Sequence, residues 1–149
     1  FAGEGPTKSE LIRATSDFSH VKVLPLQPVD RMNEWLNLAD IHLLPQMAGA
    51  ADLVLPSKLL GMLASGRPVV ATSTPGSELA ELATEAGACT TPGDSVAFAD
   101  ALRHLIANPE QRLMAGKRAR SLAEARYGKN AVLEHFEQHL LNLVESRNS

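Results

Sequence analysis

Short apolar runs alternate with amphipathic segments along the chain. Three of these runs predict strands, at Val21–Leu26, Ile41–Pro45 and Pro68–Thr72. A shorter run over Ala88–Thr91 predicts an edge strand. Strands that alternate with helices through short connections are typical of an α/β domain whose mainly parallel sheet is covered by helices on both faces.

Helices are predicted from apolar spacing and from residues that favour helix ends. Thr7 and Glu10 have the spacing of a capping box, and Asp30, Ser77 and Asp94 are candidates for the N-cap of later helices. The predicted helices cover residues 8–15, 30–39, 57–65, 77–87, 94–106, 109–127 and 129–146. Everything after residue 108 is therefore expected to be a helical tail.

Composition narrows the class of protein. The chain has 149 residues, 44% of them hydrophobic, a formal net charge of −3 and a single cysteine, Cys89. These values exclude a disordered chain and a disulfide-stapled secreted module, and they favour a reducing compartment such as the cytoplasm. No apolar run approaches the ~20 residues of a membrane span, and the acidic balance disfavours nucleic acid as a partner.

The loop that follows the second predicted strand holds the most informative chemistry. It ends at Pro56, and Ser57 and Lys58 open the next helix. The free amides and positive dipole of a helix N-terminus bind anions, whereas a lysine there is unfavourable unless an anion is bound. Ser57, Lys58 and the amides up to Leu59 therefore predict a diphosphate site. The alternative is that Ser57 only caps the helix and Lys58 points to solvent.

Other candidate sites are weaker. The loops Pro25–Pro28 and Ser73–Gly76 could contact a base, sugar or phosphate, but such sequences more often form simple turns. His135 and His139 are four residues apart and lack a third metal ligand, so no metal site is predicted. The chain also lacks the Gly-x-Ser-x-Gly and Walker motifs.

The string from Leu55 to Thr72, LPSKLLGMLASGRPVVAT, resembles the signature region of the retaining glycosyltransferases of family four. The resemblance extends through Phe1–Pro6, Val21–Pro28 and Leu38–Pro45. It implies the GT-B architecture, in which two Rossmann-like domains face each other and the C-terminal one holds the nucleotide-sugar donor. This chain resembles that C-terminal domain, of the type found in bacterial polysaccharide biosynthesis.

The resemblance also implies roles for residues. Ser57 and Lys58 match the helix N-terminus that meets the donor diphosphate, which makes Lys58 the expected catalytic group. Leu24, Pro25 and Leu26 match the segment whose backbone faces the base.

One departure concerns the family's pair of glutamates, which are separated by seven residues. Leu53 and Gly61 occupy the two positions here, and Asp52 is adjacent to the first. In the family the first glutamate lies near the transferred sugar and the second holds the ribose. The sugar and ribose region is therefore expected at Asp52, Leu53 and Gly61, without the usual carboxylates.

The implied function is transfer of a hexose, with retention, from a nucleoside-diphosphate sugar to a saccharide or lipid-linked acceptor. We expect residues 1–149 to form one Rossmann-like donor-binding domain, a fragment that lacks its first strand and the acceptor-binding N-terminal domain and is inactive alone. No cofactor is expected. The resemblance is compatible with a cytoplasmic enzyme that associates peripherally with the inner face of the membrane.

The sequence also predicts self-association and leaves two alternative functions open. In the family the last helix packs on the N-terminal domain, so the stripe of Leu133, Phe136 and Leu140 would be uncovered here and would favour a homodimer. The alternative functions are a nucleotide-sugar epimerase and a non-catalytic nucleotide-binding or assembly module.

Overall fold

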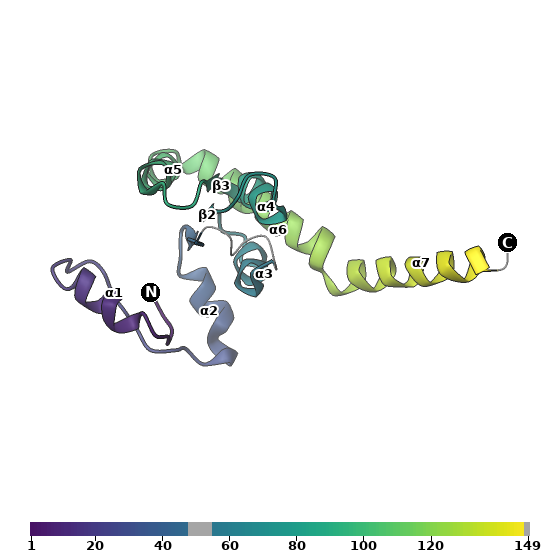
Figure 1. Ribbon diagram of the computed structural model, residues 1–149, viewed down its shortest axis with the longest axis horizontal. Helices are drawn as coiled ribbons and strands as arrows, with labels where there is room; N and C mark the ends of the chain where they lie inside the picture. Colours follow the sequence, from purple (N-terminus) through teal and green to yellow (C-terminus); the bar gives the residue numbers. More distant parts are fainter. Residues whose placement is uncertain (48–54, 148–149) are drawn as a thin grey trace. The chain divides into compact units, whose positions relative to one another are not determined.

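The computed structural model describes residues 1–47 and 55–147 (Figure 1). The chain divides into two compact units, residues 1–38 and residues 39–149.

The first unit contains three short helices. It contains α1 (Lys8–Thr15), the short 3-10 helix η1 (Val29–Arg31) and α2 (Met32–Asn37). The helix predicted over residues 8–15 is confirmed. The cap predicted at Thr7 is wrong, since the Thr7 side chain makes no cap hydrogen bond and its φ and ψ of −90° and 1° differ from the extended conformation that capping requires. Asp30 is not an N-cap either, because the chain is already helical from Val29 onward.

The strand predicted over Val21–Leu26 is reduced to one backbone bridge. Ala2 and Leu24 pair in parallel, with Leu24 N–H donating to Phe1 C=O at 2.8 Å and Gly3 N–H donating to Leu24 C=O at 3.2 Å. The next residue that would face this partner is Leu26, which has no backbone hydrogen bond among the described residues. The apolar, β-branched composition of the run therefore predicted more regular pairing than the structure contains.

The second unit is an α/β domain. Its elements are β1 (His42–Leu44), α3 (Ser57–Ala64), β2 (Val69–Thr72), α4 (Glu78–Ala86), β3 (Gly87–Thr90), α5 (Ser95–Ala107), α6 (Pro109–Tyr127) and α7 (Lys129–Arg147). The strands form a parallel sheet in the order β1-β2-β3, with Leu44 opposite Ala71 and Ala71 opposite Cys89. Each of these elements lies where the sequence predicts one, and β3 is an edge strand as expected. Ser77 and Asp94 cap α4 and α5 through bonds from Ala80 N–H and Ala97 N–H.

The core lies around β2, whose four residues are all buried. Val69 and Ala71 belong to one cluster with leucines and alanines of α3, α4 and α6, and Figure 1 shows these helices grouped beside β2. Successive strand residues point to opposite faces, so the buried Val70 lies on the other face, where α5 contacts β2 and β3. The sheet is thus covered on both faces, as predicted.

Arginines of α6 hold the ends of three other helices. Arg112 donates to the carbonyl oxygens of Leu105 and Ile106 in the last turn of α5, both at 3.1 Å. Arg118 donates to Glu85 C=O near the end of α4 at 2.8 Å, and Arg120 donates to Ala64 C=O at the end of α3. Cations are favourable at helix C-termini because they compensate the dipole and satisfy free carbonyls. These arginines of α6 therefore stabilise the C-terminal ends of the helices that cover the sheet.

The last helix, α7, presents an apolar stripe. Leu133, Phe136 and Leu140 are 53%, 59% and 47% exposed. No helix in residues 1–47 and 55–147 is long and apolar enough to cross a lipid bilayer.

Candidate functional site

The N-terminus of α3 lies at the carboxyl edge of the sheet. Strands β1 and β2 are parallel neighbours, and α3 connects them. A helix that joins two parallel strands runs back along the sheet, and eight residues of α-helix span ~12 Å, about the length of these strands. Ser57 is therefore returned to the edge at which β1 and β2 end, which is where open α/β sheets bind ligands.

The start of α3 carries no compensating acid. Pro56 takes the N-cap position in an extended conformation, no side chain caps the helix, and its first turn holds no acidic residue. Ser57 is the first helical residue, so the interpretation of Ser57 as a simple N-cap does not apply. Ser57 and Lys58 are both exposed, and Lys58 forms no ion pair with any residue of the described part of the chain. The positive helix end and the ammonium group thus lie together, an arrangement that favours an anion.

Leu59 and Gly61 have different positions on the same helix. The Leu59 side chain is fully buried in the core, and its amide donates to Pro56 C=O at 2.9 Å, so the free amides of the first turn belong to residues that precede it. Gly61 is half-buried on α3 and supplies no carboxylate. Asp52 and Leu53, the other two candidates for the sugar and ribose region, lie outside the described residues.

The predicted base-binding segment lies in the first unit. The Leu24 amide and carbonyl are both used in the bridge to residues 1–3, and Pro25 C=O accepts a hydrogen bond from Gln27 Nε2 at 2.9 Å. Leu26 is 70% exposed, and its backbone has no hydrogen-bond partner among the described residues. Of the three residues, Leu26 has the backbone groups best able to pair with a base.

Hydrogen bonds that the sequence did not predict join the carboxyl ends of the strands. The Thr72 hydroxyl accepts from Gln46 N–H at 2.7 Å and donates to Gln46 C=O at 2.8 Å, which ties the segment after β1 to the end of β2. Ser73 N–H donates to Thr90 C=O at 3.0 Å, and the hydroxyls of Ser73 and Ser77 lie 2.6 Å apart. Thr72 is a threonine at the end of an otherwise apolar run, and this feature of the sequence could have indicated its hydrogen bonds.

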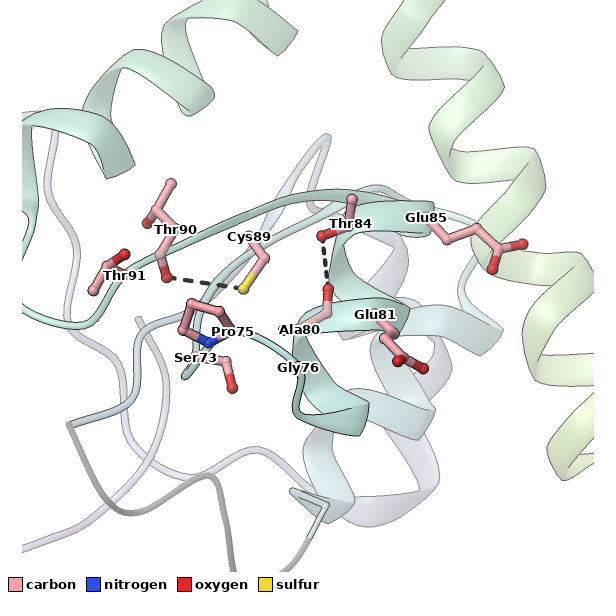
Figure 2. A pocket seen from close by; sticks show the side chains of 10 residues that line it. All are labelled: Ser73, Pro75, Gly76, Ala80, Glu81, Thr84, Glu85, Cys89, Thr90 and Thr91. Atoms are coloured by element: carbon pink, nitrogen blue, oxygen red, sulfur yellow. Dashed lines mark hydrogen bonds between the residues drawn. The ribbon is translucent and has the colours of Figure 1, made fainter.

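A groove of about 520 Å³ lies between the edge strand β3 and α4 (Figure 2). The loop after β2 lines it through Ser73, Pro75 and Gly76, so one of the weaker candidate loops does border a depression. Glu81 and Glu85 of α4 also line it, and Ser57 and Lys58 do not. Because two carboxylates repel phosphate, the groove is a poor diphosphate site, and the α3 N-terminus is the better one.

Two titratable groups of the second unit, Cys89 in the groove and Tyr127 of α6, are held in their neutral forms. Burial raises the pKa of the Cys89 thiol, which outweighs the opposing bonds from backbone amides, so the thiol stays protonated at neutral pH. Burial also raises the pKa of Tyr127, and its hydrogen bond to Glu78 Oε1, 2.9 Å long, acts in the same direction. In residues 1–47 and 55–147 no group of three or more His, Cys, Asp or Glu side chains is placed to hold a metal ion.

Comparison with solved structures confirms the predicted fold class. HepE from Anabaena, crystallised with UDP-glucose, matches with a TM-score of 0.73 at 20% identity, over 95% of this chain and 40% of that one. Sucrose-phosphate synthase from Thermosynechococcus elongatus matches with a TM-score of 0.74 at 18% identity, over 97% of this chain and 37% of that one. The chain therefore has the α/β fold of a GT-B half, followed by a helical tail.

Comparison of sequences identifies the family. The chain is 34% identical over 139 residues to the "Putative colanic acid biosynthesis glycosyl transferase WcaI" of Escherichia coli K12, an alignment that covers 90% of this chain. The chain spans about one third (33%) of that relative's length. Residues 1–108 match the family described as "Glycosyl transferases group 1". This chain therefore belongs to the group 1 glycosyl transferases.

Proposed function

We propose that the full-length protein transfers a hexose from a nucleoside-diphosphate sugar to a saccharide or lipid-linked acceptor with retention, and that this chain binds the donor. The observation that carries the proposal is the start of α3, where exposed Lys58 adjoins a helix end without a compensating acid. Family membership supports the reaction class. HepE, a structural neighbour, was crystallised with UDP and with UDP-glucose, which supports a nucleotide-sugar donor.

The proposed mechanism is electrostatic. As the bond between the sugar and the diphosphate breaks, negative charge grows on the departing diphosphate. The amides at the start of α3, the Ser57 hydroxyl and the Lys58 ammonium group would stabilise that charge without rearrangement. Because these groups supply the positive charge themselves, we propose that the reaction needs no cofactor and no metal ion.

The family resemblance suggests further donor contacts. The base would pair with backbone groups of the segment Leu24–Leu26, chiefly those of Leu26. The transferred sugar and the ribose would lie near Asp52, Leu53 and Gly61. Since Gly61 offers no carboxylate, the ribose hydroxyls would have to pair with other groups, and we expect weaker ribose discrimination than a glutamate would give.

The remaining partners belong to the full-length protein. We propose that an N-terminal domain binds the acceptor, and that the enzyme works in the cytoplasm at the inner face of the membrane. The E. coli relative is named for colanic acid biosynthesis. The similarity of this chain to that relative supports an acceptor that is used in polysaccharide synthesis.

Calorimetric titration of the full-length protein with UDP and GDP tests the donor site. We expect Lys58→Ala to weaken binding of the preferred nucleotide at least tenfold and to lower kcat by about 10²-fold or more, as removal of one charge-stabilising group does in other enzymes. Lys117→Ala is the matched control, because Lys117 is an exposed lysine on α6. Equal affinity and rate in the Lys58 and Lys117 variants would contradict the proposal.

A second candidate is a non-catalytic nucleotide-binding module, favoured by the absence of glutamate at positions 53 and 61. It predicts the same loss of UDP or GDP affinity in Lys58→Ala. It differs in predicting no sugar transfer by the wild-type protein with any donor and acceptor.

A further inference from the structure

We infer that Thr72 is a positioning residue for the donor site, because its hydroxyl fixes the chain where it leaves β1 toward the N-terminus of α3. This inference rests on the proposed donor site at Ser57 and Lys58. Thr72 itself is 6% exposed and would not touch the donor.

The hydrogen bonds of Thr72 extend the pairing of β1 with β2 by one step. The β1–β2 register ends with Leu44 opposite Ala71. Because His42 N–H donates to Pro68 C=O and alternate residues of a parallel strand face the same neighbour, Gln46 is the next residue whose backbone groups are directed at β2. The Thr72 hydroxyl accepts from Gln46 N–H at 2.7 Å and donates to Gln46 C=O at 2.8 Å. One side chain thus satisfies both backbone groups of Gln46.

The two ends of the connection between β1 and α3 lie at the same edge of the sheet. Its far end is held because Leu59 and Leu63, which follow Ser57 on α3, are fully buried in the core. Its near end is held at Gln46 by Thr72. Loss of the hydroxyl would give Gln46 conformational freedom that donor binding would have to remove, and such ordering lowers affinity.

Thr90 offers a matched control. It is the last residue of β3, as Thr72 is the last residue of β2, and its hydroxyl is also buried. The Thr90 hydroxyl, however, has no hydrogen-bond partner among the described residues. Replacing Thr90 by valine removes a buried hydroxyl of the same type without removing an anchor.

The test compares threonine variants in the full-length protein by UDP titration and by donor kinetics. Thr72→Val should raise the Kd for UDP and the donor KM about five- to tenfold and change kcat by less than about twofold. Thr72→Ser, which keeps the hydroxyl, should stay within about twofold of wild type, and so should Thr90→Val. Thr72→Cys, which keeps only a weak donor and acceptor, should fall between serine and valine.

The outcomes separate this inference from the proposed function. If Lys58→Ala weakens UDP binding but the valine and cysteine variants of Thr72 bind UDP like Thr90→Val, the positioning role is overturned and the donor site stands. If Lys58→Ala has no effect, the donor site itself fails. Should Thr72→Val not fold, the cysteine and serine variants decide the question. Because Kd is measured per folded site, mere loss of folded protein would not imitate the expected shift.

Discussion

His42 is a buried histidine whose hydrogen bonds identify its protonation. The Ser65 hydroxyl lies 3.0 Å from His42 Nε2 and donates its own proton to Met62 C=O at 2.6 Å. Since that proton is used, the bond between His42 and Ser65 must have Nε2–H as the donor. Neutral His42 therefore carries its proton on Nε2.

The environment of His42 predicts a pH dependence of stability. Burial lowers the pKa of His42 from its ordinary value, and the positive charge of Arg67 lowers it further. A lowered pKa means that the unfolded chain binds the proton more tightly. Neutral His42 should thus make its full contribution to the free energy of unfolding above about pH 6.5. This contribution should be lost as the pH falls through the pKa of His42 in the folded chain. Urea unfolding at a series of pH values measures this effect, and His42→Gln should flatten the acid limb. An unchanged pH profile in the variant would rule out His42 as the cause.

Gly116 allows α6 to approach the turn after α3. A Cβ atom at Gly116 would lie 2.3 Å from Gly66 C=O, and Gly66 has a φ of +70° that favours glycine. Gly116→Ala should cost about 1–2 kcal/mol of unfolding free energy, because a clash of 1–3 kcal/mol exceeds the gain of up to ~1 kcal/mol in helix propensity. Chemical denaturation checks this value. Ser121→Ala, at an exposed position of the same helix, should be neutral or slightly stabilising.

Among the elements, α6 organises the second unit. It packs on α3, α4, α5 and α7, and its arginines donate to carbonyl oxygens at the ends of three of those helices. The sequence predicted this helix over residues 109–127. The structure shows that Ala115, Ala119 and Leu122 form part of its buried face. The partners of its arginines come from distant parts of the chain, so sequence spacing could not identify them.

Arg118 tests the capping role of α6. Its Nε donates to Glu85 C=O at 2.8 Å, near the C-terminus of α4. We expect Arg118→Met to lower the unfolding free energy by about 1 kcal/mol, the value of a hydrogen bond and a favourable dipole contact at an exposed site. Arg126→Met is the control, since Arg126 is exposed on α6 and has no hydrogen bond to another element in the described part of the chain. Equal denaturation midpoints for the two variants would argue against a capping contribution.

For the whole molecule, the exposed stripe of α7 bears on self-association. Leu133, Phe136, Leu140 and Leu143 follow the 3-4-3 spacing of a coiled-coil seam and are about half exposed. We expect the isolated chain to dimerise through this stripe, with a light-scattering mass that rises with concentration. The double variant Leu133→Glu/Leu140→Glu should stay monomeric, whereas Glu134→Gln on the polar side should behave like wild type. A monomer mass at all concentrations of the unmodified chain would contradict this expectation.

The sequence alone determined most of the elements and the chemistry at the start of α3. Local backbone preferences depend on neighbouring residues, so they can be predicted from the sequence. Examples are the apolar runs at residues 41–45 and 68–72, Gly66 at the end of a helix, and Ser77 and Asp94 at the start of helices. The α3 signal was local too, because Ser57 and Lys58 adjoin the helix end that they affect.

The tertiary structure alone decided which distant groups meet. It reduced residues 21–26 to a single bridge beside Pro25, and it placed the Thr72 hydroxyl on Gln46 and the α6 arginines on the ends of three helices. These contacts join residues many positions apart, so they depend on strand register and helix packing rather than on local preference. The reason is physical: a hydrogen bond requires two groups within about 3 Å, and only the folded chain sets that distance.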